Sequence, residues 1–226
     1  HKDVVQLLLN HSERIELNVK ANDGSTAFMQ ACISGRKDVV QLLLDHSERI
    51  EPNVRCNSGC NAFVYACNEG HKDVIKLLLD HSERIDLNAR RNAGKTAFMS
   101  ACINGRKDIV QLLLDHFERI EPNARSSHGW TAFMYACRNG HKDVVQLLLD
   151  HSETIDLNTR ELLEGWTALM LACREGHTDV IKLLLQMSNI DLNARSNNGR
   201  TALMFACCNG HKDVVKLLLN HSERID

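Results

Sequence analysis

Apolar and polar residues follow each other along this chain in a pattern that returns about every 35 residues. Each copy starts with a stretch such as TAFMQACISG and goes on to a stretch such as RKDVVQLLLDH. In the first stretch Phe28, Ala31 and Cys32 stand at positions i, i+3 and i+4, and in the second the apolar residues run from Val39 to Leu44. This spacing gathers apolar side chains on one side of a helix. The pattern therefore predicts two short helices in every copy.

A glycine follows the first predicted helix of each copy and marks the period. These glycines are Gly35, Gly70, Gly105, Gly140, Gly176 and Gly210. They are 35, 35, 35, 36 and 34 residues apart, because one copy carries an extra residue in TRELLEG and the next is shortened at QMSNIDLN. Both changes fall in connections, which a stacked array tolerates since its repeats contact each other through their helices. The sequence therefore predicts tandem repeats rather than one central core.

Polar residues at the ends of the apolar stretches indicate how the helices are capped. Thr26 precedes the first helix and can cap it with its hydroxyl group, and Asn61, which replaces Thr in one copy, caps as well as Thr does. Asp38 lies in the first turn of the second helix, where the helix dipole favours an acidic side chain. A histidine often follows the glycine, and we expect it to donate a hydrogen bond that stabilises the turn. These histidines are His71, His141, His177 and His211.

The six first-helix segments read TAFMQA, NAFVYA, TAFMSA, TAFMYA, TALMLA and TALMFA, each followed by G-[HR]-x-D-[VI]-[VI]-x-L-L-L. They resemble the T-P-L-H-x-A motif of the ankyrin repeat family, and the resemblance covers essentially the whole chain. It implies an all-α, helix-turn-helix solenoid with projecting hairpin loops. Ala replaces the usual Pro and Met or Val replaces the usual His. The family's helix-ending glycine is missing from the DHSERIDLN-type segments, so we expect the second helix to run on before the hairpin.

The repeat boundaries divide the chain into a half repeat and six further repeats of one array over residues 1–226. The half repeat covers residues 1–21, and the others start near residues 22, 57, 92, 127, 164 and 197. Terminal units of such arrays usually carry a polar outer face, and neither end of this chain shows one. We therefore expect the array to continue beyond both ends. Uncapped terminal helices could also associate end to end with other copies of the chain.

Composition narrows the classes of function. The chain has 27 Lys and Arg residues against 29 Asp and Glu, so its formal charge of -2 argues against a nucleic-acid binder. No run approaches the roughly 18 apolar residues that span a bilayer, and no signal segment opens the chain. Six of the nine cysteines occupy one position of the first helix, where we expect small core residues and a reducing, cytoplasmic or otherwise intracellular compartment. These six are Cys32, Cys67, Cys102, Cys137, Cys173 and Cys207.

Residue patterns that suggest chemistry do not support a catalytic or metal site. Cys56 and Cys60 form one C-x-x-x-C segment in a predicted hairpin, but no second Cys or His pair lies nearby in the sequence to complete a zinc site. Triplets such as Asp80-His81-Ser82 contain the residue types of a hydrolase triad, but adjacent helical residues point about 100° apart and cannot form a relay. The sequence contains no phosphate-binding or nucleophile motif. We therefore expect no enzyme, cofactor or metal.

The positions at which the copies differ indicate where a partner binds. A helical wheel places the near-constant residues on one face of the first helix and the variable ones opposite, and the residue before the helix cap varies too. The resemblance implies that this face and the hairpin tips line a concave groove that binds proteins. Trp, Tyr and Arg concentrate binding energy at interfaces. The predicted partner-binding residues are Tyr65, Trp130, Tyr135, Arg138, Trp166, Leu171, Arg174, Arg200 and Phe205.

These observations lead to a non-catalytic scaffold that binds a protein partner on its concave face. Two other interpretations remain open. The array can serve as a structural spacer or spring, in which case the tryptophans only pack on adjacent hairpins. It can also be the recruiting segment of a larger enzyme or channel.

Overall fold

The computed structural model describes residues 2–11, 15–46, 48–221 and 223. Every regular element within these residues is a helix, as the sequence predicts. The α-helices are α1 (Lys2–Asn10), α2 (Ala27–Ile33), α3 (Lys37–Asp45), α4 (Ala62–Glu69), α5 (Lys72–Asp80), α6 (Ala97–Ile103), α7 (Lys107–Leu114), α8 (Ala132–Arg138), α9 (Lys142–Asp150), α10 (Ala168–Glu175), α11 (Thr178–Gln186), α12 (Ala202–Cys208) and α13 (Lys212–Leu219). Two short 3₁₀ helices are η2 (Asn92–Gly94) and η3 (Phe117–Arg119).

Contacts along the chain divide it into two units. The first comprises residues 1–100 and 112–121, and the second comprises residues 101–111 and 122–226. Helices α6 and α7 each contribute residues to both units. The predicted organisation as one array over the whole chain stays a prediction, and each unit is described by itself.

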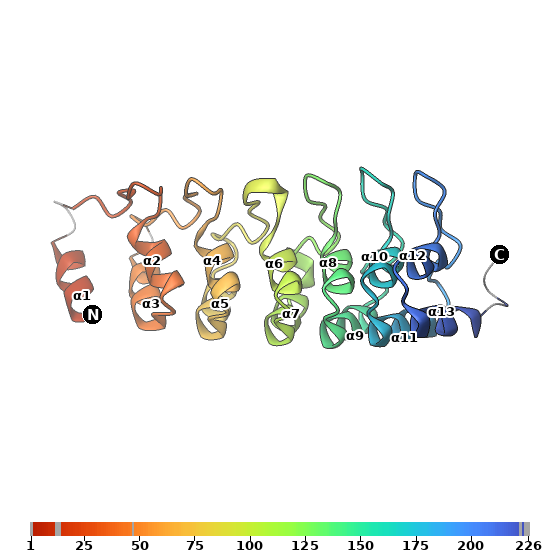
Figure 1. Cartoon of the computed structure of the whole chain (residues 1–226). Coiled ribbons are helices and arrows are strands. Elements are labelled where there is room, and N and C mark those ends of the chain that lie inside the picture. The colour runs from red at the N-terminus through yellow and green to blue at the C-terminus, as the bar shows by residue number, and fades with distance from the viewer. Residues whose placement is uncertain (1, 12–14, 47, 222, 224–226) are drawn as a thin grey trace. The chain divides into compact units, whose positions relative to one another are not determined.

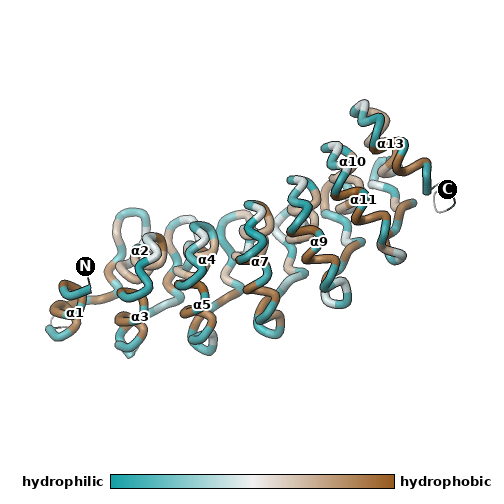
Figure 2. The backbone as a smooth tube through the Cα atoms, turned by 90° about the horizontal axis from the view of Figure 1, so that it is seen from below, coloured by the Kyte–Doolittle hydropathy of each residue, from teal (hydrophilic) through white to brown (hydrophobic). Residues whose placement is uncertain are grey.

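Both units repeat the same arrangement of paired helices. In the first unit, α2 pairs with α3 and α4 with α5, while α2 packs against α4 and α3 against α5 (Figure 1). In the second, the first helices α8, α10 and α12 form one row and the second helices α9, α11 and α13 form another. A hairpin-shaped loop leads into each first helix (Figure 1). Figure 2 shows hydrophobic residues in the helices, for example along α9 and α11, and mainly hydrophilic loops between the pairs.

The apolar positions of the pattern form the core of each pair. Phe63 and Phe133 of the first helices have 0% and 1% of their surface exposed, and the leucine run of the second helix, such as Leu147–Leu149, is buried. Burial of one such side chain contributes about 1.5–3 kcal/mol, which explains why helices of only seven to nine residues are stable here.

Polar side chains cap the N-termini of the first helices and the C-terminus of the second helix. The hydroxyl group of Thr26 accepts a hydrogen bond from the Met29 amide over 3.3 Å, and Asn61 Oδ1 accepts one from the Val64 amide over 3.0 Å, which confirms the predicted caps. The expectation that the second helix runs on is wrong. Helix α3 ends at Asp45, because the ring nitrogen Nδ1 of His46 donates to the Leu42 carbonyl at 2.9 Å and the chain then turns.

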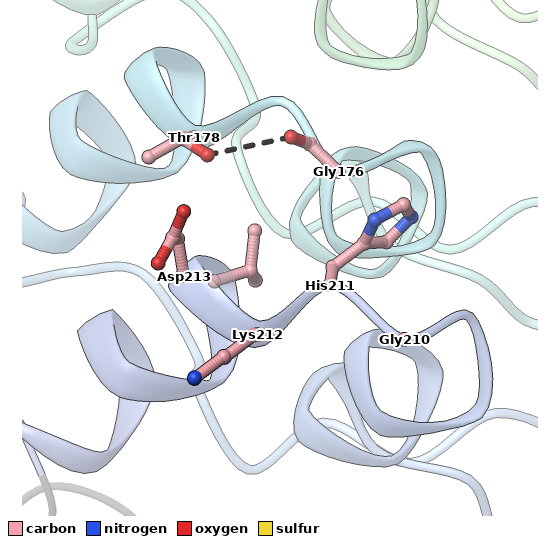
Figure 3. Close-up of a pocket in the computed structure, with 7 residues that line it drawn as sticks. Gly176, Thr178, Gly210, His211, Lys212 and Asp213 are labelled. Atoms are coloured by element: carbon pink, nitrogen blue, oxygen red, sulfur yellow. Dashed lines mark hydrogen bonds between the residues drawn. The ribbon is translucent and has the colours of Figure 1, made fainter.

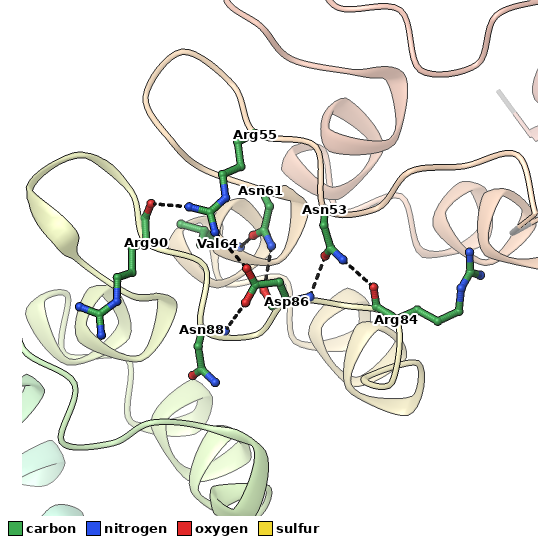
Figure 4. Close-up of polar contacts among 8 residues, drawn as sticks. All are labelled: Asn53, Arg55, Asn61, Val64, Arg84, Asp86, Asn88 and Arg90. Carbon is green, nitrogen blue, oxygen red and sulfur yellow. Dashed lines mark hydrogen bonds and ion pairs between the residues drawn. The ribbon is translucent and has the colours of Figure 1, made fainter.

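An asparagine in each connection joins one hairpin base to the next. Asn53 Nδ2 donates to the Arg84 carbonyl at 2.8 Å, and its Oδ1 accepts from the Asp86 amide at 2.7 Å (Figure 4). A side-chain amide carries both a donor and an acceptor, so one residue can make both bonds. The same pair of bonds recurs at Asn18, Asn88, Asn123 and Asn158.

Arginine side chains add a second link between hairpins. Arg55 donates from Nη1 to the Arg90 carbonyl at 3.2 Å and pairs through Nη2 with Asp86 at 3.0 Å (Figure 4). Within the second unit, Arg125 donates in the same way to the Arg160 carbonyl. Charge and backbone bonding therefore fix the spacing of neighbouring hairpins inside each unit.

Five of the six repeated cysteines are core residues, as predicted. Cys32, Cys67, Cys102, Cys137 and Cys173 are completely buried, and burial raises the pKa of each thiol. Cys207 is exposed instead, because among the described residues no helix pair follows that of α12 and α13 to cover it. All nine cysteines are free thiols. None of the described helices is long and apolar enough to cross a bilayer.

Candidate protein-binding site

Two tryptophans stand at the same position of successive hairpins in the second unit. Trp130 directly precedes the cap of α8, and Trp166 directly precedes the cap of α10. The Ser126 amide donates to the Trp130 carbonyl at 2.9 Å, and the Glu161 amide donates to the Trp166 carbonyl at 3.0 Å. These bonds close the hairpins and fix the backbone positions from which the two indole side chains extend. Both residues are half-buried, so part of each remains accessible.

An arginine from the end of the following helix lies over each indole ring. The guanidinium carbon of Arg138 is 5.1 Å from the centre of the Trp130 ring, and that of Arg174 is 4.8 Å from the Trp166 ring. Both distances fall within the range of cation–π attraction, worth about 0.5–1 kcal/mol at exposed sites. The side chains of Arg138 and Arg174 stay 45% and 40% exposed, so that both guanidinium groups can reach a partner.

Glu175 connects the two stacks. Its Oε1 lies 3.9 Å from the Nε atoms of both Arg138 and Arg174. One carboxylate faces two guanidinium groups, and this patch therefore keeps a net positive charge. The contacts also show that the two stacks are neighbours on one surface. We call Trp130, Arg138, Trp166, Arg174 and Glu175 the stacked patch.

Aromatic rings in contact with the indoles hold them in place. The rings of Trp130 and Tyr135 have centres 5.1 Å apart and are tilted by 34°. Trp166 meets Phe205 of the next repeat edge to face, with centres 5.4 Å apart. Such pairs add about 0.5–1.5 kcal/mol beyond the area that they bury. The indole Nε1 of Trp166 is buried and has no hydrogen-bond partner within the part of the chain that the structure describes.

The burial of three predicted site residues differs from what the helical wheel implied. Leu171, Phe205 and Tyr135 are only 0%, 4% and 8% exposed, so they support the surface rather than form it. A wheel drawn for one helix treats the side opposite its core stripe as free. In the folded chain, the indole rings and neighbouring repeats cover much of that side.

Two predicted residues have contacts other than those that form the stacked patch. Tyr65 belongs to the first unit, where its hydroxyl group lies 3.2 Å from Cys56 Sγ. Arg200 is exposed at the next hairpin of the second unit, and its amide donates to the Ser196 hydroxyl at 3.0 Å. The structure thus brings together Trp130, Tyr135, Arg138, Trp166, Arg174 and Phe205 through the ring and ion contacts described above.

The hairpin before Trp166 carries a feature that the sequence analysis missed. Glu161 is 5% exposed, and its carboxylate accepts hydrogen bonds from the amides of Leu163, Glu164 and Trp166. These bonds order the extended tip and leave Leu162 and Leu163 with 62% and 67% of their surface exposed. The extra residue in TRELLEG was the available signal, but a length change alone does not reveal where the two leucines point.

Two of the repeated histidines bond to the backbone of the arginines of the stacked patch. His177 Nε2 lies 2.7 Å from the Arg138 carbonyl and His211 Nε2 lies 2.9 Å from the Arg174 carbonyl. A carbonyl oxygen only accepts, so each ring donates, as expected for these histidines. The helix ends that carry both arginines are therefore tied to the following repeat.

Shallow depressions lie beside these histidines. One of about 320 Å³ is lined by Gly176, Thr178, His211 and Lys212, among others (Figure 3). Similar ones of about 170 and 230 Å³ lie beside His141 and His71. Because they recur at one position of the repeat, we attribute them to helix packing rather than to a ligand site. No cluster of three or more potential metal ligands occurs among the described residues.

The Asp-His-Ser triplets show no catalytic arrangement where they are described. His81 Nδ1 lies 2.9 Å from the Leu77 carbonyl, and His151 Nδ1 lies 2.9 Å from the Leu147 carbonyl. Each ring therefore ends a second helix.

The chain was compared with known proteins. A family model described as ankyrin repeats (3 copies) matches residues 1–91, 83–161 and 155–226. A search of the curated proteins found no match. The family matches extend over the full length of the paired helices, their caps and the hairpins between them. The chain therefore belongs to the ankyrin repeat family.

Proposed function

We propose that this chain is a non-catalytic scaffold that binds a protein partner, and that the partner contacts the stacked patch of the second unit. Ankyrin repeats are generally protein-binding modules. The observation that carries the proposal is the pair of indole–guanidinium stacks in successive repeats, half-buried and joined by Glu175. Trp and Arg dominate hot spots because they bring large rigid area and several donors to a desolvated contact.

The chemistry of the patch favours a partner segment with an acidic and an apolar side chain. Two guanidinium groups facing one carboxylate leave capacity for a further carboxylate, which Arg binds in a bidentate manner. Leu162 and Leu163 offer exposed apolar area at the hairpin beside Trp166. We place the segment along the first helices and hairpins, the face that corresponds to the concave groove of the family.

The test combines Arg138→Ala with Arg174→Ala in one variant. Removal of both guanidinium groups should weaken partner binding at least tenfold, since hot-spot arginines contribute about 2 kcal/mol or more each. Trp130 and Trp166 are the only tryptophans of the chain, so their fluorescence reports events at the patch directly. Capture from an extract of the source cells identifies candidates, and titration of a purified candidate gives the dissociation constant.

The matched control is Lys142→Ala with Lys182→Ala, which removes two exposed positive charges from second helices of the same unit. It should bind like the original chain. Equal binding by the arginine variant and the control would exclude the stacked patch. If no candidate changes the tryptophan fluorescence or depends on the two arginines, the spacer interpretation is favoured.

We also propose that the protein is located inside the cell. Nine free thiols, five of them aligned in the buried helix rows, suit a reducing compartment. A tagged full-length chain followed by cell fractionation tests it.

A further inference from the structure

One hairpin of the first unit differs from the others in its chemistry, because cysteines stand at both of its closing positions. The Cys56 amide donates to the Cys60 carbonyl at 3.0 Å, and the Gly59 amide donates to the Cys56 carbonyl at 2.9 Å. Gly59 has a φ of 79°, which permits this three-residue turn. Cys56 and Cys60 therefore face each other across the closed turn, the arrangement that a disulfide within a hairpin requires.

Both sulfur atoms lie beside the same hydroxyl group. Ser58 Oγ is 3.0 Å from Cys56 Sγ and donates to Cys60 Sγ at 3.4 Å. The hydroxyl group of Tyr65, a residue of helix α4, also lies 3.2 Å from Cys56 Sγ. The two thiols therefore point to the same side of the hairpin, and one of them is surrounded by two hydroxyl groups.

These contacts change the acidity of Cys56. Burial raises the pKa of its thiol, but hydrogen bonds with Ser58 and Tyr65 and with nearby backbone amides outweigh this effect and hold the pKa below the usual value. Burial keeps the pKa of Cys60 raised. The cysteines of the helix rows, such as Cys67, have strongly raised pKa values without such partners. Because the thiolate is the nucleophile, Cys56 is set apart from the buried row.

The hairpin is also held in position from both sides. The Asn57 amide donates to the Asp23 carbonyl at 3.0 Å, and the Asn92 amide donates to the Ser58 carbonyl at 2.9 Å. Asn57 and Ser58 are exposed at the tip, whereas Cys56 and Cys60 are 7% and 3% exposed, so a small reagent has to pass the tip to reach the sulfur atoms. The cysteines stand next to each other before any oxidation occurs.

We propose that Cys56 and Cys60 form a thiol modification site, at which a peroxide converts the two thiols into a disulfide within the hairpin. The Cys56 thiolate attacks one oxygen of the peroxide, the O–O bond breaks, and hydroxide leaves and takes up a proton to form water. Cys56 is then a sulfenic acid. The Cys60 sulfur attacks the Cys56 sulfur, the S–S bond forms as the S–O bond breaks, and the proton of Cys60 leaves with the hydroxide as a second water. Two thiols are oxidised and one peroxide is reduced.

The experiment uses the whole reduced chain, treated with hydrogen peroxide at neutral pH, quenched with an alkylating reagent and mapped by tandem mass spectrometry. We expect a disulfide between Cys56 and Cys60, with both alkylated only in the untreated sample. Cys32 lies in the helix row with no surface exposed and a strongly raised pKa, unlike Cys56, and is the internal reference for a thiol that does not react. Cys207 and Cys208, which are exposed, show that the peroxide dose was effective.

Three variants assign the roles. Cys60→Ser should leave a sulfenic acid at Cys56 that dimedone labels, and Cys56→Ser should leave Cys60 reduced. Ser58→Ala should slow disulfide formation several-fold, since Cys56 loses a hydrogen-bond partner that favours its thiolate. Circular dichroism of each variant confirms that the helices are retained.

Two results would overturn the proposal. One is alkylation of both Cys56 and Cys60 at a dose that has fully oxidised Cys207 and Cys208. The other is oxidation of Cys56 mainly into disulfides with other cysteines or between chains. Neither outcome bears on the stacked patch, which contains none of these residues.

Discussion

Two glycines with the same backbone conformation allow two costs of substitution to be measured separately. Gly176 and Gly210 follow α10 and α12 and have φ values of 79° and 72°. A Cβ atom at Gly176 would lie 2.6 Å from the ring of His211, whereas nothing lies within 4 Å of one at Gly210. Left-handed backbone alone costs an alanine about 1–2 kcal/mol, and a forced contact adds about 1–3 kcal/mol.

We therefore expect Gly176→Ala to reduce the free energy of unfolding clearly more than Gly210→Ala does. Urea denaturation followed by circular dichroism measures both. Since His211 donates to the Arg174 carbonyl, Gly176→Ala should also disturb the stack on Trp166 and change the tryptophan fluorescence of the folded chain. Identical denaturation midpoints for the two variants would show that the His211 ring moves aside without lowering the free energy of unfolding.

Single residues also show the limits of reading a surface from one helix. The sequence selected Trp130, Arg138, Trp166 and Arg174 because all four stand at positions where the copies differ, and the structure brings them into contact. That they bind a partner stays a prediction. Its grouping of Leu171 and Phe205 with them followed from the same variation, but both are buried. Variation between copies marks positions outside the repeated core, and a large ring from a neighbouring position can still cover them.

The hairpin tips differ from repeat to repeat, whereas the hydrogen bonds at the hairpin bases recur. Asn158 uses both ends of its amide, donating to the Asn189 carbonyl at 2.7 Å and accepting from the Asp191 amide at 3.0 Å. Glu161 then builds the longer tip of the same hairpin. The base fixes the spacing between neighbouring hairpins, and the tip is free to carry two exposed leucines.

Replacement of that asparagine tests the role of the base. Asn158→Ala should destabilise the chain by about 1–3 kcal/mol, because a backbone donor and a backbone acceptor lose their partner together. Asn198→Ala, at an exposed hairpin tip, removes one side-chain contact with Ser196 and should cost less. Thermal unfolding compares the two variants. Equal melting temperatures would mean that water replaces the amide of Asn158 without loss.

At the scale of the whole molecule, contacts are made between neighbouring repeats, so the effect of a core substitution should stay local. Phe63 of α4 is fully buried in the first unit, while both tryptophans lie in the second. Phe63→Ala should lower the free energy of unfolding of the first unit by about 3–5 kcal/mol. Circular dichroism senses all helices and tryptophan fluorescence senses the second unit alone.

We expect Phe63→Ala to shift the circular-dichroism transition to lower urea concentration than the fluorescence transition. The mirror substitution Phe133→Ala, in α8, should shift the fluorescence transition strongly. Coincident transitions for Phe63→Ala would instead indicate that the chain unfolds as one cooperative body. The predicted association of terminal helices between copies stays a prediction, and sedimentation at several concentrations measures it.

The sequence by itself determined the helices, their caps and their order. Those features depend on contacts within about four residues and on a pattern repeated six times, so that errors in one copy are corrected by the others. The tertiary structure alone decided where side chains 30 to 40 residues apart meet. It placed Glu175 between two arginines, gave two cysteines a shared serine and a tyrosine, and turned Leu162 and Leu163 outward. Contacts between repeats depend on how consecutive repeats are stacked, and those within one hairpin depend on how its turn closes. The spacing of residues along one helix carries no information about either.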